Sequence, residues 1–354
     1  MQEIGAVGFE GPEKRLEVEF VKAPCRNPIP RGFRSYDRTF WKEFLKAAQC
    51  TILSDISNEF ADAYLLSESS LFVFPTKIII KTCGTTTLLK IVPQLLHEAN
   101  NLGLRVASLQ YSRSCFLFPE KQPFPHSSFE EEINYLNFFL DEGESRVLGP
   151  EGRVTRWHVY QWNLPGFACP KNCVEIMMFS LDPVAMKQFY IGEGVEVGTS
   201  GGAITTFQTG LESLLGENVI VDAYNFDPCG YSMNALINDV FFTVHITPEP
   251  NCSYVSFETN ATPVQYSALI AGVLSIFKPS EFAVGITSND HRILVSSVLE
   301  SGDSTIGAGY LVVDLSSTWL SGSVEPHCDA PELSVPHRSW KLFDVVSSLA
   351  DQIS

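Results

Sequence analysis

Ser69 is the side chain in this sequence with the most specific chemical potential. It directly follows Glu68 in the segment Leu66-Ser-Glu-Ser-Ser70, between two apolar runs. A serine held in a strained turn can attack the carbonyl carbon of the preceding residue and convert that peptide bond into an ester. Such a reaction needs a hydrogen-bond donor for the oxyanion and a base for a later proton removal. Taken alone, the segment is better explained as a polar surface turn.

Two further segments offer a thiol and a proton-transfer pair. Cys83 stands two residues after Lys81, a candidate positive neighbour, although a lone cysteine is usually a small core residue. Ser232 follows a turn rich in Pro and Gly, and His245 lies at the end of a predicted strand. The two could meet across a hairpin and exchange a proton. A buried histidine that is merely hydrogen-bonded fits the sequence equally well.

Two carboxylates stand near the start of the chain. Glu10 and Glu13 are three residues apart, and Phe9 lies beside them. A solvated acidic N-terminus is the simplest interpretation of such a pair. The glycine-rich stretch 192–202 lacks the lysine of a phosphate-binding loop, and we expect it to be a surface loop.

Apolar spacing predicts the elements that must position these groups. Period-two or continuous apolar runs predict strands at 16–21, 105–111, 156–162, 175–180, 241–246, 254–259, 281–286 and 308–314. Pro75 divides 70–82 into two runs and predicts a hairpin or bend. Spacing at i, i+3 and i+4 predicts helices at 39–48, 87–100, 129–139 and 263–277. The alternation indicates an α+β protein with largely antiparallel sheets.

Composition limits the partners and the compartment. The 354 residues carry a net charge of −17, which argues against nucleic acid as a partner. No stretch is long and apolar enough to predict a membrane span, and no signal sequence is visible, so we expect a cytoplasmic protein. The nine cysteines, Cys169 and Cys173 included, lack the spacing of a metal site and are expected to be free thiols.

Several segments, in order and spacing, resemble the pyruvoyl-dependent S-adenosylmethionine decarboxylase proenzymes of eukaryotes, and those of plants in particular. They are Phe9-Glu-Gly-x-Glu-Lys14, 66–70 with 81–86, Phe226-Asp-Pro-Cys-Gly-Tyr-Ser-Met-Asn234, 245–249 with 253–258, and Trp157-His-Val-Tyr160. The resemblance covers roughly residues 9 to 290. It implies one domain over 1–320 with a four-layer α/β/β/α sandwich of two antiparallel sheets and helices on the outer faces. Residues 321–354 form a tail that the resemblance does not assign.

The resemblance also implies self-cleavage between Glu68 and Ser69. Ser69 would attack the Glu68 carbonyl, His245 would remove the α-proton of the resulting ester, and Ser232 would assist. The products would be a β chain of residues 1–68 and an α chain of residues 69–354, whose first residue becomes a pyruvoyl group. That group would form a Schiff base with S-adenosylmethionine and accept electrons as CO₂ leaves, so neither pyridoxal phosphate nor a metal is implied. Cys83 would return a proton to the substrate.

Other roles follow from the same resemblance. Phe9 and Phe226 would stack on adenine, Glu249 would bind the ribose, and the backbone of Leu66 would contact the base, with Glu68 also at the substrate site. Glu10 and Glu13 would lie near the reacting end, and Glu10 would also take part in cleavage. A pocket that holds putrescine in animal relatives would contain Arg15, Arg113, Glu175 and His291 here. Cys173 stands where threonine is usual.

The implied activity is that of a carboxy-lyase in spermidine and spermine biosynthesis, working as an αβ monomer. One alternative is a non-catalytic paralogue that regulates an active partner. Such a protein should have lost the cleavage pair or Cys83, and this sequence keeps both. A second alternative, a serine hydrolase using Ser232 and His245, lacks the Gly-x-Ser-x-Gly elbow.

Overall fold

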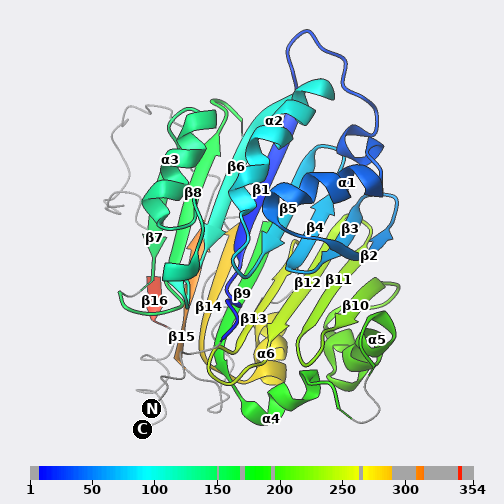
Figure 1. Ribbon diagram of the computed structural model, residues 1–354, viewed down its shortest axis with the longest axis vertical. Coiled ribbons are helices and arrows are strands. Elements are labelled where there is room, and N and C mark those ends of the chain that lie inside the picture. Colours follow the sequence, from blue (N-terminus) through cyan, green and yellow to red (C-terminus); the bar gives the residue numbers. More distant parts are fainter. Residues whose placement is uncertain are drawn as a thin grey trace, which may run out of the picture.

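The strands of the protein form two sheets that pack face to face, with helices on both outer sides (Figure 1). The computed structural model describes residues 8–149, 151–167, 172–192, 196–262, 266–288, 308–314 and 342–344. Within these ranges, no helix has the length and apolar character to cross a membrane, and no group of three or more His, Cys, Asp or Glu is placed to hold a metal ion. The predicted α+β sandwich is confirmed.

The first sheet contains the candidate cleavage site and is antiparallel throughout. Its strands run in the order β2 (Ile52–Ser57), β3 (Asp62–Leu66), β4 (Ser69–Val73), β5 (Lys77–Thr82), β1 (Lys14–Lys22), β6 (Leu104–Arg113), β8 (Trp157–Asn163) and β7 (Glu144–Leu148). β4 and β5 form the hairpin that was predicted from Pro75. Proline has no N–H to donate to a strand ladder, so the strand is interrupted there.

The second sheet contains the candidate proton-transfer pair. Its strands run in the order β10 (Ile220–Asn225), β11 (Tyr231–Ile237), β12 (Val240–Thr247), β13 (Tyr254–Thr259), β9 (Asn172–Leu181), β14 (Pro279–Ser288), β15 (Ala308–Asp314) and β16 (Leu342–Asp344). All neighbours pair antiparallel except β14 and β15, which are parallel. β2, β3, β7, β10, β11 and β16 were not predicted.

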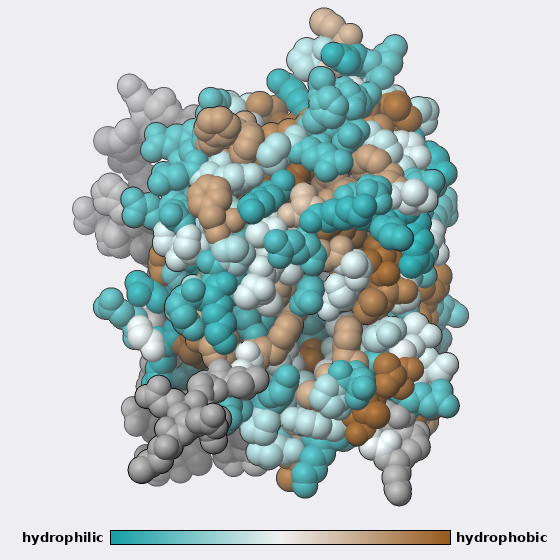
Figure 2. Space-filling view, in the orientation of Figure 1, coloured by the Kyte–Doolittle hydropathy of each residue, from teal (hydrophilic) through white to brown (hydrophobic). Residues whose placement is uncertain are grey.

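Each sheet buries its outer face under helices. The first is covered by α1 (Arg38–Phe44), α2 (Val92–Asn101) and α3 (Phe129–Phe139), and the second by α4 (Pro183–Met186), α5 (Thr199–Gln208) and α6 (Tyr266–Phe277). The Asp37 and Ser128 side chains accept hydrogen bonds from the first turns of α1 and α3, which fixes where these helices begin. The face in Figure 2 is mostly hydrophilic.

The expectation of a surface loop over 192–202 is wrong in its second half, where α5 begins. A side chain at Gly202 would place its Cβ 2.4 Å from the backbone of Ala223 in β10. Glycine at this position therefore lets the helix pack directly on the strand. Pro263, expected in the first turn of α6, and most of the tail at 321–354 lie outside the described residues, so the tail stays a prediction.

The layer between the sheets is part apolar and part ionic. Phe72 of β4 and Phe241 of β12 meet across it with ring centroids 4.6 Å apart. Beside this contact lie Glu13, Arg15, Lys81, Glu175 and Glu258, all buried. Charged side chains are rarely buried unless they are paired, and clusters of them often occur at functional sites. This cluster is therefore the candidate functional part of the interface.

Candidate active site

Ser69 begins β4, directly after the two-residue connection from β3. Its side chain is 3% exposed, and its φ is +128°, a value that side-chain-bearing residues rarely adopt. The hairpin pairs Leu66 with Ser69 and β4 with β5, so residue 69 is fixed on both sides by neighbouring strands. This is strained backbone at a buried hydroxyl, in the position where the sequence predicted chemistry.

The carbonyl oxygen of Glu68 accepts a hydrogen bond from the backbone N–H of Cys83 at 2.9 Å. The Cys83 thiol lies 3.4 Å from the same oxygen and 3.6 Å from Glu68 Oε2. Cys83 directly follows β5, and the pairing of Ser69 with Thr82 brings it to this carbonyl. A donor aimed at a carbonyl oxygen stabilises the negative charge that forms there when the carbon is attacked. Burial raises the pKa of the Cys83 thiol well above its usual value, so the thiol keeps its proton.

Glu13 accepts a hydrogen bond from the Ser69 hydroxyl through Oε1. Its Oε2 lies 3.2 Å from Lys81 Nζ, and Lys81 Nζ also lies 3.0 Å from Glu258 Oε2 and 3.9 Å from Glu175 Oε1. Burial alone would raise the pKa of Glu13, but the Lys81 ammonium holds it below its usual value. The carboxylate that faces Ser69 is therefore ionised at neutral pH.

His245 of β12 is held by hydroxyl groups on both ring nitrogens. Nδ1 is 2.8 Å from Ser232 Oγ, while Nε2 is 2.8 Å from Thr243 Oγ1 and 2.9 Å from Ser70 Oγ. Both Ser70 and Thr243 donate to Asn234 Oδ1, at 2.6 and 3.0 Å. Burial lowers the pKa of His245 to about 4, so the imidazole is neutral at physiological pH. The structure thus joins Ser232 and His245 and places them beside the residue that follows Ser69.

Glu10 and Glu13 separate in space. Glu10 accepts hydrogen bonds from the backbone N–H groups of Leu117 and Phe118, at 2.8 and 2.7 Å. Burial raises the pKa of Glu10, and these two bonds oppose that effect. Phe9 is 39% exposed and approaches the Cys83 loop, since a Cβ on Gly84 would lie 3.5 Å from its ring.

The remaining substrate-binding candidates lie in strands or directly after them. Leu66 is fully buried in β3, and its backbone is part of the hairpin. Phe226 follows β10 and packs against Tyr224 with ring centroids 5.0 Å apart. Glu249 lies in the loop after β12, where its carbonyl oxygen accepts from Cys252 N–H. Their roles toward a substrate stay predictions.

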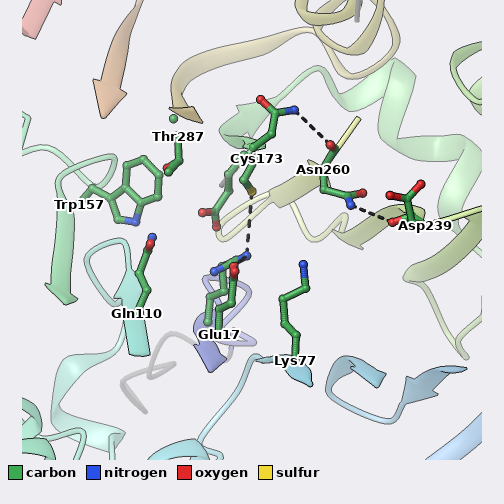
Figure 3. Close-up of a pocket in the computed structure, with 12 residues that line it drawn as sticks. Glu17, Lys77, Gln110, Trp157, Cys173, Asp239, Asn260 and Thr287 are labelled. Atoms are coloured by element: carbon green, nitrogen blue, oxygen red, sulfur yellow. Dashed lines mark hydrogen bonds and ion pairs between the residues drawn. The ribbon is translucent and has the colours of Figure 1, made fainter. Parts of the chain in front are cut away.

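A cavity of about 240 Å³ lies between the sheets near this cluster (Figure 3). Arg15 lines it and bonds Glu258 at 2.9 Å through Nε and Glu17 at 2.6 Å. Cys173 is 3.6 Å from Glu258 Oε1, and Glu175 also faces the cavity. The other lining residues are Lys77, Gln110, Trp157, Asn172, Asp239, Asn260, Gly285 and Thr287.

Arg113 does not share this cavity with Arg15, so that part of the prediction is wrong. Arg113 bonds Glu132 of α3 at 2.8 Å, and its guanidinium lies over the ring of Phe129. In the register of β1 and β6 Arg15 pairs with Ser112. Arg113 is the next residue along β6, and successive side chains alternate between the faces, so it points toward the helices. His291 lies outside the described residues.

The residues that complete these contacts were not predicted as site residues from the sequence. They are Ser70, Asn234, Thr243, Glu258 and, as an ion-pair partner, Lys81. The sequence feature that could have indicated them is a polar residue within an apolar strand, as in Ile-Ile-Ile-Lys of β5 and Val-Ser-Phe-Glu of β13. Such residues are recognisable only once the strand's inner face is known.

Comparison with known proteins gives a consistent result. The model of the adenosylmethionine decarboxylase family matches residues 6–318. A protein of Dictyostelium discoideum named S-adenosylmethionine decarboxylase proenzyme is 42% identical over 293 residues, which cover 80% of this chain and 75% of that protein. A protein of the same name from Daucus carota is 40% identical over 365 residues and covers 96% of both chains.

A solved structure of the Trypanosoma brucei AdoMetDC-delta26 monomer aligns with 60% of this chain and 77% of its own, at 28% identity and a TM-score of 0.48. The family match covers most of the chain, and the two relatives are well above 30% identity over most of their length. The chain therefore belongs to the adenosylmethionine decarboxylase family.

Proposed function

We propose that this protein decarboxylates S-adenosylmethionine, and so supplies the aminopropyl donor for spermidine and spermine synthesis, with a pyruvoyl cofactor made from its own Ser69. Family membership and the names of the relatives support the reaction. One structural observation carries the self-cleavage. The Ser69 hydroxyl faces Glu13, while the carbonyl it would attack is held by Cys83. The attacking hydroxyl and the carbonyl under attack are thus positioned by separate partners.

The first step is an attack of Ser69 Oγ on the Glu68 carbonyl carbon. The Glu13 carboxylate accepts the hydroxyl proton, and the Cys83 N–H stabilises the oxyanion. The C–N bond then breaks, the amine of residue 69 takes up a proton, and an ester joins Glu68 to the Ser69 oxygen. The positive φ at Ser69 is strain that this rearrangement releases.

The second step is an elimination. His245 is neutral and close to residue 70, and we assign it the α-proton of residue 69. As that proton leaves, the ester C–O bond breaks and Glu68 departs as a free carboxylate. The dehydroalanine left at residue 69 then tautomerises and takes up water. Ammonia leaves, and the α chain begins with a pyruvoyl group.

The surroundings of residue 69 fit a small ketone that must be kept from bulk water, because this position is 3% exposed. When present, the pyruvoyl group supplies a carbonyl that reacts with the substrate amine and withdraws the electron pair released with CO₂. The Cys83 thiol retains its proton and is the donor for the substrate α-carbon. Phe9 offers an exposed aromatic face near this thiol for the adenine ring.

Intact-mass measurement of the purified protein tests the proposal. We expect two chains, residues 1–68 and 69–354, with the larger one blocked to N-terminal sequencing. Borohydride with S-adenosylmethionine should attach substrate to the larger chain. A Ser69→Ala variant should stay uncut and take up no substrate.

Ser67→Ala is the matched control, because Ser67 lies in the same turn and its hydroxyl only accepts from Thr51 N–H. It should be cut normally. A single full-length wild-type chain, or an ordinary serine amine at residue 69, would reject the proposed function. A non-catalytic paralogue predicts that outcome.

A further inference from the structure

Lys14 is a fully buried lysine whose hydrogen bonds go to neutral oxygen atoms. It is the first residue of β1 and has 0% exposure. Its Nζ donates to the Gly84 carbonyl oxygen at 2.9 Å and to Gln122 Oε1 at 3.0 Å. Burial of an ammonium group costs several kcal/mol, and neither acceptor carries a compensating charge. The two acceptors therefore do not explain why a lysine is kept there.

Gly84 is held by hydrogen bonds at both its N–H and its carbonyl oxygen. Its N–H donates to the Glu10 carbonyl oxygen at 2.8 Å. Its carbonyl accepts from Lys14 and, at 3.4 Å, from Gln122 Nε2. Gly84 has a φ of +64°, so this turn is one that only a held glycine adopts comfortably. Two segments distant in sequence, residues 10–14 and Gln122, thus converge on Gly84.

Gly84 directly follows Cys83, whose N–H is the donor on the Glu68 carbonyl oxygen. Only the two backbone dihedral angles of Cys83 separate the Gly84 N–H from the Cys83 N–H, and the bonds to the Gly84 carbonyl hold Gly84 from its other side. The clamp on Gly84 therefore restricts the orientation of Cys83. Released from the clamp, the Cys83 N–H and thiol could move from the scissile carbonyl. A shift of about 1 Å in such a group can slow a reaction about 100-fold.

The charge of Lys14 acts on the same region. It lowers the pKa values of Glu10 and Glu68, against the larger raising effect of their burial. It opposes the rise in the Cys83 pKa in the same way. A positive charge that favours anions at these three residues also favours the oxyanion on Glu68.

We propose that Lys14 and Gln122 are positioning residues for chain cleavage, which hold the Cys83 N–H on the Glu68 carbonyl by fixing Gly84, the residue after Cys83. Lys14 adds a positive charge that stabilises the oxyanion. The inference rests on the proposed function, since it concerns the self-cleavage step. Neither residue contacts Ser69, so both act through Cys83.

Ionisation of Lys14 gives this role a pH signature. Burial lowers the pKa of Lys14 to about 8, so its charge is lost as the pH rises through that value. The charged and titratable groups around it are Glu10, Cys50, Glu68, Cys83, Arg113, His126 and Glu132. Cys50 and Cys83 have raised pKa values, and His126 titrates near 4, so these three keep their protonation state near pH 8.

The test follows cleavage of freshly synthesised precursor by gel and intact mass between pH 6.5 and 9.5. Lys14→Met removes both hydrogen bonds and the charge, and Gln122→Met removes the bridge while keeping the lysine. Lys121→Met is the matched control, an exposed lysine beside Gln122. Circular dichroism of each variant reports folding.

We expect wild-type cleavage to slow above about pH 8. Lys14→Met should cleave about 10- to 100-fold more slowly at pH 7 and show no further loss across pH 8. Gln122→Met should be slowed less and keep the alkaline decline, and Lys121→Met should match the wild type. If Lys14→Met does not fold, the cleavage rate of Gln122→Met and the pH profile of the wild type still test the inference.

Wild-type rates of cleavage in folded Lys14→Met or Gln122→Met, or a wild-type profile flat to pH 9.5, would overturn this inference alone. A wild-type chain that never cuts would instead overturn the proposed function.

Discussion

Replacing Glu13 with glutamine probes the cleavage step most directly. Glu13→Gln keeps the shape of the side chain but removes the charge that faces Ser69. At the 3.2 Å separation between Glu13 Oε2 and Lys81 Nζ, the charge pair is worth about 5 kcal/mol at an effective dielectric constant of about 20. Lys81 keeps Glu258 at 3.0 Å, so the folded state should lose only about 1–3 kcal/mol. The variant should therefore still fold.

Cleavage should suffer much more than stability in the Glu13→Gln variant. Loss of a general base slows a reaction about 10²- to 10⁴-fold, or about 3–5 kcal/mol in activation free energy. The assay is the rate at which full-length precursor converts to two chains, measured by intact mass at pH 7. Glu17→Gln is the control, since Glu17 is also buried on β1 but pairs with Arg15.

Equal cleavage rates in Glu13→Gln and wild type would refute the assignment of the base. Equal slowing in Glu17→Gln would show that any buried charge on this face matters, and would refute a specific role for Glu13.

Three more variants test the cavity, the thiol and the core. Burial raises the pKa of Glu175 from 4.5 to about 7. Between these pH values the folded state keeps a proton on Glu175 that the unfolded state has lost. The free energy of unfolding therefore falls as the pH rises from about 4.5 to 7. Glu175→Gln should therefore melt about 5 °C above wild type at pH 8 but not at pH 4.5, as calorimetry can check. Cys83→Ala keeps the backbone donor, so the cleavage rate should stay within about tenfold of the wild-type rate, while the rate of CO₂ release should fall about 10²- to 10⁴-fold. A Cys83→Ala precursor that stays uncut would contradict this. Phe72→Ala loses its contact with Phe241 and should cost about 3–5 kcal/mol in urea unfolding, and a loss under about 1 kcal/mol would argue against a packed interface.

Most strands that position the site were predictable, because they bury one or both faces and their composition shows it. β3, which leads to Glu68, and β11, which carries Ser232, were not predicted although both are buried. The run at 16–21 became β1, and Pro75 divided β4 from β5 as expected. The helix at 129–139 was predicted to the residue, since Ser128 and the acidic first turn mark its start. The edge strands β2, β7 and β10 were missed, because their residues are more exposed and less regularly patterned.

The chemical identities in the candidate site came from the sequence, because a nucleophile, a thiol, an imidazole and carboxylates are properties of single residues. The sequence did not show which of these residues lie together in space. Ser70 meets His245 across 175 positions of chain, and only the packing of two sheets brings them together. Two carboxylates that looked equivalent also diverged, Glu13 toward Ser69 and Glu10 toward a backbone loop.

Sequence alone indicated most of the strands and which side chains can react. The tertiary structure decided which face each side chain occupies, and so placed Arg15 between the sheets and Arg113 under α3. The physical reason is the two-residue period of a strand. A shift of one residue reverses the face, so direction is fixed only when strand register and sheet packing are set together.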